Sequence, residues 1–128
     1  TSGYFSGTGM FYRAEPGFVI QGGTQSGSSQ TVAWEDTGLL NNKYTISMAR
    51  SGDPSSATDS GTGSSEFFIN LAANGNLDSY EYPYVVFGKV VSGFSIVDQI
   101  AVMPTTASGG INMIDSPVQF TSVTITAV

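Results

Sequence analysis

The sequence predicts a mainly β fold, in which an antiparallel sheet curls into a barrel and is capped by short helices. In most hydrophobic segments apolar residues alternate with polar ones, which is the period of a half-buried strand. Gly-Gly and Asn-Gly pairs and runs of serine and glycine separate these segments, as expected for turns and loops. A single segment has apolar residues at helical spacing instead.

The clearest strand is predicted at residues 44–49, where Tyr44, Ile46 and Met48 alternate with smaller, more polar residues. Further strands are predicted at residues 18–21, 66–70, 84–87 and 118–128. A helix is predicted over residues 94–101, which lie between Gly93 and Pro104. Residues 51–65 are almost all Ser, Gly, Thr and Asp, so a mobile surface loop is expected there.

Composition limits the possible functions. The 128 residues form one predicted domain without an internal boundary, and a net charge of −6 with four basic residues argues against nucleic-acid binding. No apolar run is long enough to span a bilayer. The absence of His and Cys excludes a His-containing hydrolase triad, a thiol nucleophile and a typical zinc site. A composition poor in Lys and rich in Ser and Thr favours an exported protein, and any targeting segment is expected to be already removed.

Three ordered segments carry a family pattern. The first, residues 11–23, reads F-Y-R-A-E-P-G-F-V-I-Q-G-G. The second consists of residues 46–50 and, after an insertion, residues 65–70; the third consists of residues 76–78, 86–90 and 97–98. In order and spacing these segments resemble the cyclophilin family of peptidyl-prolyl isomerases. The resemblance implies a closed antiparallel β-barrel with short capping helices.

The resemblance also implies an activity, namely cis/trans isomerisation of X–Pro bonds in polypeptides, which assists protein folding. Amide resonance opposes the rotation with a barrier of about 18–20 kcal/mol. A fixed hydrogen-bond donor at the imide nitrogen, beside an apolar socket for the proline ring, would favour the twisted transition state. No metal, cofactor, nucleophile or general base is needed, which agrees with a chain that lacks His and Cys.

By the same resemblance Arg13 is the expected donor, because its guanidinium stays charged and presents several N–H groups in a rigid fork. Gln21 is expected to bind a substrate carbonyl, and Phe18 completes the catalytic set. The expected substrate-binding residues are Val19, Ala49, Arg50, Phe68, Asn76, Leu77 and Tyr84. Phe67 and Ile69 fall on the opposite strand face and are expected to be core residues. Gly22 and Gly23 lack the following Lys or helix of a phosphate loop and are interpreted as turn positions.

Five positions depart from the family pattern: Tyr12 stands for His, Val19 for Met, Glu66 for Gln, Asn76 for an aromatic residue and Tyr84 for a frequent His. The changes at 19 and 76 shrink the apolar socket and predict weak binding of cyclosporin, a cyclic peptide that blocks many cyclophilins. Glu66 is expected on the face of Phe68, where it would face Arg13.

Cyclophilins carry two strands and a helix before the position that matches Tyr4, so residues 1–128 are expected to form an N-terminally incomplete domain. A first alternative is a module that binds proline segments without turning them over, which Glu66 and the reduced socket favour. A second alternative is a secreted adhesive or carbohydrate-binding β-domain. The Ser- and Asn-rich composition favours this second alternative, but it explains none of the three motifs.

Overall fold

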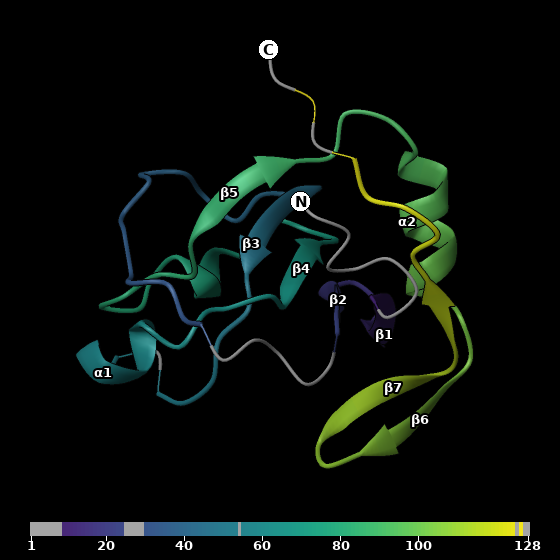
Figure 1. Ribbon diagram of the computed structural model, residues 1–128, viewed down its shortest axis with the longest axis horizontal. Helices are drawn as coiled ribbons and strands as arrows, with labels where there is room; N and C mark the ends of the chain where they lie inside the picture. The colour runs from purple at the N-terminus through teal and green to yellow at the C-terminus, as the bar shows by residue number, and fades with distance from the viewer. Residues whose placement is uncertain (1–8, 25–29, 54, 125, 127–128) are drawn as a thin grey trace.

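A single antiparallel sheet dominates the computed structural model, which describes residues 9–24, 30–53, 55–124 and 126. Its seven strands lie in the order β5-β3-β4-β2-β1-β7-β6 (Figure 1). The strands are β1 Met10–Glu15, β2 Val19–Gly23, β3 Thr45–Met48, β4 Phe67–Asn70, β5 Val86–Lys89, β6 Thr105–Ser108 and β7 Ile111–Gln119. The helices are α1 Ala57–Ser60, α2 Phe94–Ala101 and the 3₁₀ turn η1 Gly75–Leu77. The predicted mainly β fold with short helices is confirmed.

Whether the sheet closes into the predicted barrel depends on the pairing of its two edge strands, β5 and β6. Within the described residues β5 pairs only with β3, and β6 pairs only with β7. The hairpin of β6 and β7 extends away from the other strands (Figure 1). Closure of the sheet into a barrel is therefore not confirmed. Among the residues that the structure describes, no helix is long and apolar enough to cross a membrane.

The sheet separates two apolar clusters because neighbouring residues of a strand point to opposite faces. Ile20 and Ile69 face α2 and join the main core, whose buried members are Ala14, Ile20, Ile69, Leu71, Val97, Ile100, Ala101 and Ile114. Val19 and Phe68, one position earlier on the same strands, join a second cluster with Ala49 and Leu77. The core role predicted for Ile69 is confirmed. The second cluster forms the floor of the candidate site.

Some elements differ from the sequence prediction. Helix α2 has the predicted bounds, but a strand over residues 118–128 is wrong, because β7 begins at Ile111 and ends at Gln119. Strand β7 is defined by its pairing with β1, which is distant in the chain, and with β6, the preceding strand of the same hairpin, and not by its own periodicity. Residues 125, 127 and 128 of the predicted strand lie outside the described residues.

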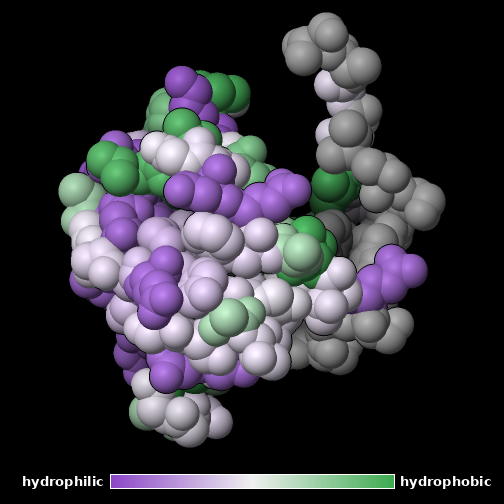
Figure 2. All heavy atoms as spheres, turned by 90° about the vertical axis from the view of Figure 1, so that its left-hand side faces the viewer, coloured by the Kyte–Doolittle hydropathy of each residue, from purple (hydrophilic) through white to green (hydrophobic). Residues whose placement is uncertain are grey.

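The insertion at residues 51–65 is partly ordered into a helical turn. Helix α1 begins after Ser56, whose hydroxyl oxygen accepts a hydrogen bond from the amide of Asp59 at 3.2 Å, as an N-cap residue does. Asp59 in turn accepts a hydrogen bond from the amide of Asp53 at 2.8 Å. Helix α1 lies on the side of the molecule that Figure 2 shows, where near-neutral and hydrophilic side chains predominate.

Candidate functional site

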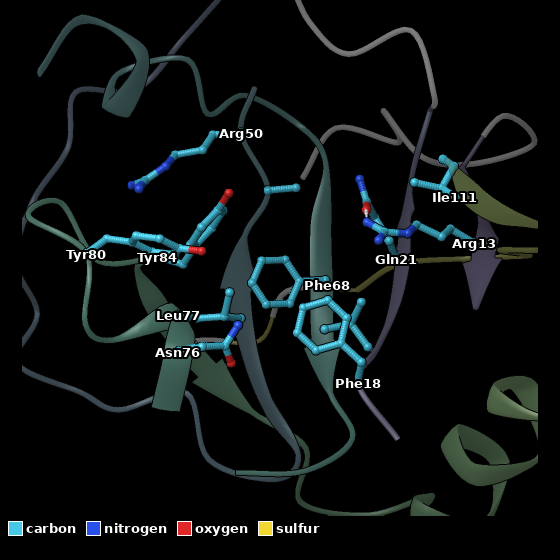
Figure 3. A pocket seen from close by; sticks show the side chains of 12 residues that line it. Arg13, Phe18, Gln21, Arg50, Phe68, Asn76, Leu77, Tyr80, Tyr84 and Ile111 are labelled. Carbon is cyan, nitrogen blue, oxygen red and sulfur yellow. Dashed lines mark hydrogen bonds between the residues drawn. The ribbon is translucent and has the colours of Figure 1, made fainter. Parts of the chain in front are cut away.

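A pocket of about 380 Å³ opens on the face of the sheet opposite α2. Its lining residues are Arg13, Phe18, Val19, Gln21, Ala49, Arg50, Phe68, Asn76, Leu77, Tyr80, Tyr84 and Ile111 (Figure 3). All ten residues that the sequence nominated for the site are among them. The roles given to these residues by the family resemblance stay predictions.

The middle of the pocket is apolar. The rings of Phe18 and Phe68 lie between Arg13 on one side and Tyr84 on the other (Figure 3). Phe68 and Tyr84 meet edge to face, with ring centroids 5.8 Å apart. The buried side chains of Val19, Ala49 and Leu77 complete the floor. A small apolar ring such as that of proline fits the chemistry of this floor.

A β-bulge in β1 determines how Arg13 enters the pocket. Phe11 pairs with Gly22 and Arg13 pairs with Gln21, so two steps along β1 match a single step along β2 and Tyr12 is the extra residue. The same irregularity appears in the pairing of β1 with β7. Bulges of this kind redirect side chains. As a result Arg13 lies directly beside Gln21 at the edge of the apolar floor.

The Arg13 guanidinium uses only some of its N–H donors within the described residues. Its NH1 donates to Oε1 of Gln21 at 2.9 Å, and its Nε lies 3.7 Å from Oε1 of Glu15. Among the described residues this Nε is the buried side-chain nitrogen without a hydrogen-bond partner. A buried donor without a partner is costly and is found at sites that receive a ligand. The arrangement can therefore offer a charged donor to a group bound on the apolar floor.

Glu66 is placed behind this pair and not in the pocket lining. Its Oε1 accepts a hydrogen bond from the Tyr12 hydroxyl at 2.9 Å, and the same hydroxyl accepts one from Nε2 of Gln21 at 3.1 Å. Burial, and secondarily Glu66, raise the pKa of Tyr12 well above its usual range. The expected direct approach of Glu66 to Arg13 is thus replaced by a contact with the neighbouring Tyr12.

Gly22 and Gly23 are strand residues, so their interpretation as turn positions is wrong. A Cβ on Gly22 would lie 2.9 Å from the ring of Phe11, and one on Gly23 would lie 2.3 Å from Oε2 of Glu66. Both positions therefore require a residue without a side chain. Gly23 leaves the space that the Glu66 carboxylate fills.

Arg50 shapes the opposite wall of the pocket. Its guanidinium lies over the Tyr84 ring, 4.3 Å from the centroid, and donates to the carbonyls of Pro83, at 3.2 Å, and Tyr82. Burial lowers the pKa of Arg50. These bonds fix the loop that carries Tyr84, and the contact with substrate that the resemblance implied for Arg50 stays a prediction.

A buried amide network supports the floor from below. Nδ2 of Asn41 donates to the Asp78 carboxylate at 2.8 Å and to the Tyr84 carbonyl at 3.0 Å. Oδ1 of Asn41 accepts from Oγ of Ser47 at 2.6 Å and from Nδ2 of Asn70 at 3.0 Å. The side chains of Asn41, Ser47 and Asn70 are fully buried. The network joins β3 and β4 to the loop of η1, which carries Asn76 and Leu77.

Sequence reasoning missed Tyr80, Ile111, Asn41 and Asn74. Nδ2 of Asn74 donates to the Phe18 carbonyl at 2.9 Å and so fixes one wall of the pocket. Ile111 reaches the pocket because Glu15 accepts hydrogen bonds from the amide and the side chain of Asn112, at 2.8 and 3.0 Å. No local pattern marks Ile111. Asn41 and Asn74 each end a short apolar run and are followed by polar residues or glycine, so no local pattern marks them either.

A metal centre finds no support in the described ranges, where no three acidic, His or Cys side chains gather in a way that could hold an ion. The polar side chains that line the pocket carry the guanidinium groups of Arg13 and Arg50, the amides of Gln21 and Asn76, and the hydroxyls of Tyr80 and Tyr84.

Comparisons with known proteins identify relatives of this chain. Residues 1–127 match the family model described as cyclophilin type peptidyl-prolyl cis-trans isomerase/CLD. The chain is 42% identical over 113 residues to peptidyl-prolyl cis-trans isomerase A of Dickeya dadantii, covering 81% of this chain and 56% of the relative. A peptidyl-prolyl cis-trans isomerase of Acinetobacter baylyi is 38% identical, with 98% of this chain and 68% of the relative covered. The chain thus spans little more than half the length of the Dickeya relative.

A solved structure shares the fold. It is a cyclophilin type peptidyl-prolyl cis-trans isomerase of Cryptosporidium parvum, crystallised in the presence of the dipeptide Ala-Pro. The two structures superpose with a TM-score of 0.67 at 26% identity, covering 93% of this chain and 78% of that chain.

Proposed function

Since the chain belongs to the family of cyclophilin-type peptidyl-prolyl cis-trans isomerases, we propose that it accelerates the cis/trans isomerisation of X–Pro bonds in polypeptides. One observation carries the proposal: the Arg13 guanidinium, whose buried Nε has no hydrogen-bond partner among the described residues, lies at the edge of an apolar floor built on Phe18 and Phe68. The Ala-Pro dipeptide used with the Cryptosporidium relative supports a proline-containing ligand for this pocket.

The proposed mechanism uses position and charge alone. The proline ring lies on the apolar floor of Phe18, Val19, Phe68 and Leu77, and Gln21 donates to a backbone carbonyl of the substrate. As the amide twists, its nitrogen becomes pyramidal and gains a lone pair. Arg13 donates a hydrogen bond to that lone pair, an interaction absent in the planar ground state, and so lowers the barrier.

The test is a protease-coupled isomerisation assay with a short chromogenic X–Pro peptide, run beside a calorimetric titration of a proline peptide that the protease does not cut. The proposal expects isomerisation that rises linearly with the concentration of the chain, above the spontaneous exchange of tens to hundreds of seconds. Peptide binding without any acceleration would contradict it and establish the non-enzymatic module. If the chain neither binds the peptide nor accelerates isomerisation, the pocket is not a proline-binding site.

We further propose that the seven strands belong to a closed barrel that requires two additional strands between β5 and β6, in keeping with the two ends of the described sheet. Edge strands leave one row of amides unpaired. Hydrogen exchange should therefore be fast for alternate amides of β5 and β6 and slow throughout β2, which is paired on both sides. A chimera that adds the two N-terminal strands implied by the family resemblance should protect those amides. Equal protection of β2, β5 and β6 without added strands would contradict the proposal.

Cyclosporin binding gives a further prediction at Asn76, which lines the pocket beside Leu77. Asn76→Trp should tighten cyclosporin binding at least about tenfold, because an indole adds a broad apolar face and an N–H donor that together contribute over 1.4 kcal/mol. Isothermal titration calorimetry measures both dissociation constants. Asn42→Trp, at an exposed asparagine outside the pocket, serves as the matched control. Equal and tight binding by the parent and Asn76→Trp would show that position 76 does not contact the drug.

A further inference from the structure

A chain of hydrogen bonds runs from the pocket to a carboxylate behind it. Arg13 NH1 donates to Gln21 Oε1 at 2.9 Å, and Gln21 Nε2 donates to the Tyr12 oxygen at 3.1 Å. The Tyr12 hydroxyl donates to Glu66 Oε1 at 2.9 Å. We propose that Tyr12 and Glu66 are positioning residues, which fix the orientation of the Gln21 amide and, through it, the Arg13 guanidinium. The inference rests on the proposed isomerase function.

Each bond in this chain dictates the direction of the next. A carboxylate only accepts hydrogen bonds, so the single hydroxyl proton of Tyr12 must point to Glu66. The Tyr12 oxygen can then only accept from Gln21, which requires the NH₂ end of the Gln21 amide to face Tyr12. The oxygen end consequently faces Arg13, whose guanidinium has donors only. A flipped Gln21 would place its NH₂ against the guanidinium and its oxygen against the lone pairs of Tyr12.

The Glu66 carboxylate is itself held in place. Its Oε2 accepts from the amide of Thr24 and from the hydroxyl of Ser65, each at 3.0 Å. The backbone of Gly23 passes so close that a Cβ there would lie 2.5 Å from the carboxyl carbon. A carboxylate fixed by several hydrogen bonds gives the chain a rigid end. The requirement for glycine at position 23 therefore serves this carboxylate.

The bulge in β1 makes the arrangement possible. In a regular strand the consecutive residues Tyr12 and Arg13 would point to opposite faces. Because Tyr12 is the extra residue between the Phe11–Gly22 and Arg13–Gln21 pairs, both side chains reach the two ends of the same Gln21 amide. Tyr12 is buried and its pKa is raised, chiefly by burial, so its phenol stays a neutral donor across the physiological pH range.

The orientation of Gln21 has a direct consequence for the substrate. Within the described part of the chain Nε2 of Gln21 makes this one bond, to Tyr12, so its second hydrogen can go to a substrate carbonyl. The Gln21 oxygen meanwhile holds one arm of the Arg13 guanidinium. Losing the Tyr12 hydroxyl would remove one of the two contacts that oppose a flip of the amide, and a flipped amide would present its oxygen to the substrate carbonyl, which repels it.

The first test removes the hydroxyl. Tyr12→Phe should lower kcat about tenfold, the effect of one lost orienting hydrogen bond, and change KM less than about threefold. Tyr44→Phe is the matched control, because the Tyr44 hydroxyl also donates to a carboxylate, that of Asp98 at 3.0 Å, but outside the pocket lining. It should keep the parental kcat. An equal loss in both variants would mean that the effect is one of stability.

The second test separates hydrogen bonding from packing at Glu66. Glu66→Gln keeps an acceptor oxygen for Tyr12 and should retain kcat within about threefold, whereas Glu66→Met has similar length and no such acceptor and should match Tyr12→Phe. The double variant Tyr12→Phe with Glu66→Met should lose no more than either single variant, since both break the same chain. The proposal would be overturned if the kcat losses of the two single variants multiplied in the double variant. It would also be overturned if Glu66→Gln were as impaired as Glu66→Met.

A readout without turnover keeps this proposal separate from the proposed function. The side-chain NH₂ resonances of Gln21 in the free protein should shift in Tyr12→Phe and Glu66→Met and stay in place in Tyr44→Phe. Such shifts in a chain that fails to accelerate isomerisation would leave the positioning role intact and refute the enzyme. Unchanged Gln21 resonances in Tyr12→Phe would refute the positioning role, whatever the activity.

Discussion

Replacing Arg13 with alanine should lower kcat/KM for an X–Pro peptide at least a hundredfold while the chain stays folded. One preorganised donor at a reacting centre is worth about 3 kcal/mol, and each 1.4 kcal/mol represents a factor of ten. Arg13 makes one side-chain bond, to Gln21, and an ion pair with Glu15 at 22% and 21% side-chain exposure. The 3.7 Å separation of this pair is too long for a hydrogen bond, so its loss should change stability little. The protease-coupled assay gives the rates, and circular dichroism checks the fold.

The chain offers a matched control for charge removal. Lys89 is an exposed cation at the end of β5 and is not part of the pocket, so Lys89→Ala should retain the parental rate. Both variants lose one positive charge, so a general effect of net charge would lower both rates alike. An Arg13→Ala chain with activity within about a factor of two of the parent would remove Arg13 from the mechanism, since such a change corresponds to under 0.5 kcal/mol.

The sequence predicted the residues of the site because its three motifs resemble those of the cyclophilin family. The resemblance assigned Phe68 to the pocket, alternation assigned Ile69 to the core on the opposite strand face, and the structure places both residues so. The bulge at Tyr12 was not predictable from alternation, because it depends on how β1 pairs with β2 and β7. The position of Glu66 behind Tyr12 follows from that bulge, which is why alternation alone placed Glu66 opposite Arg13.

Long-range pairing explains the other differences. Ile111 enters the pocket from a hairpin that Glu15 holds 97 positions away along the chain, and local patterns contain no information about such contacts. The strand predicted at residues 118–128 was set by its alternating apolar pattern. In the structure backbone pairing continues to Phe120, whose amide donates to the Gly9 carbonyl, and a periodic pattern alone does not extend the sheet beyond its partner. The location of helix α2 was predicted correctly because its signals, Gly93 and a periodic apolar face, are local.

Replacing Asn41 with leucine should lower the free energy of unfolding by about 4 kcal/mol, because several buried polar groups lose their partners at once. The Ser47 hydroxyl would lose its acceptor, the Tyr84 carbonyl would lose this donor, and Asn70 would keep only part of its bonding. At roughly 4 °C per kcal/mol for a domain of this size, the melting temperature should fall by about 15 °C. Calorimetry measures the midpoint, and urea titration measures the free energy.

Asn42→Leu provides the control, since the same chemical change at the exposed neighbour should alter stability by no more than about 0.5 kcal/mol. If Asn41→Leu does not fold, Asn70→Ala tests the same network at one node, with an expected loss of about 2 kcal/mol. Because Asn41 also binds Asp78 and the Tyr84 carbonyl, peptide affinity at low temperature should fall along with stability. A melting temperature for Asn41→Leu equal to that of Asn42→Leu would show that the amide network does not hold the floor of the pocket.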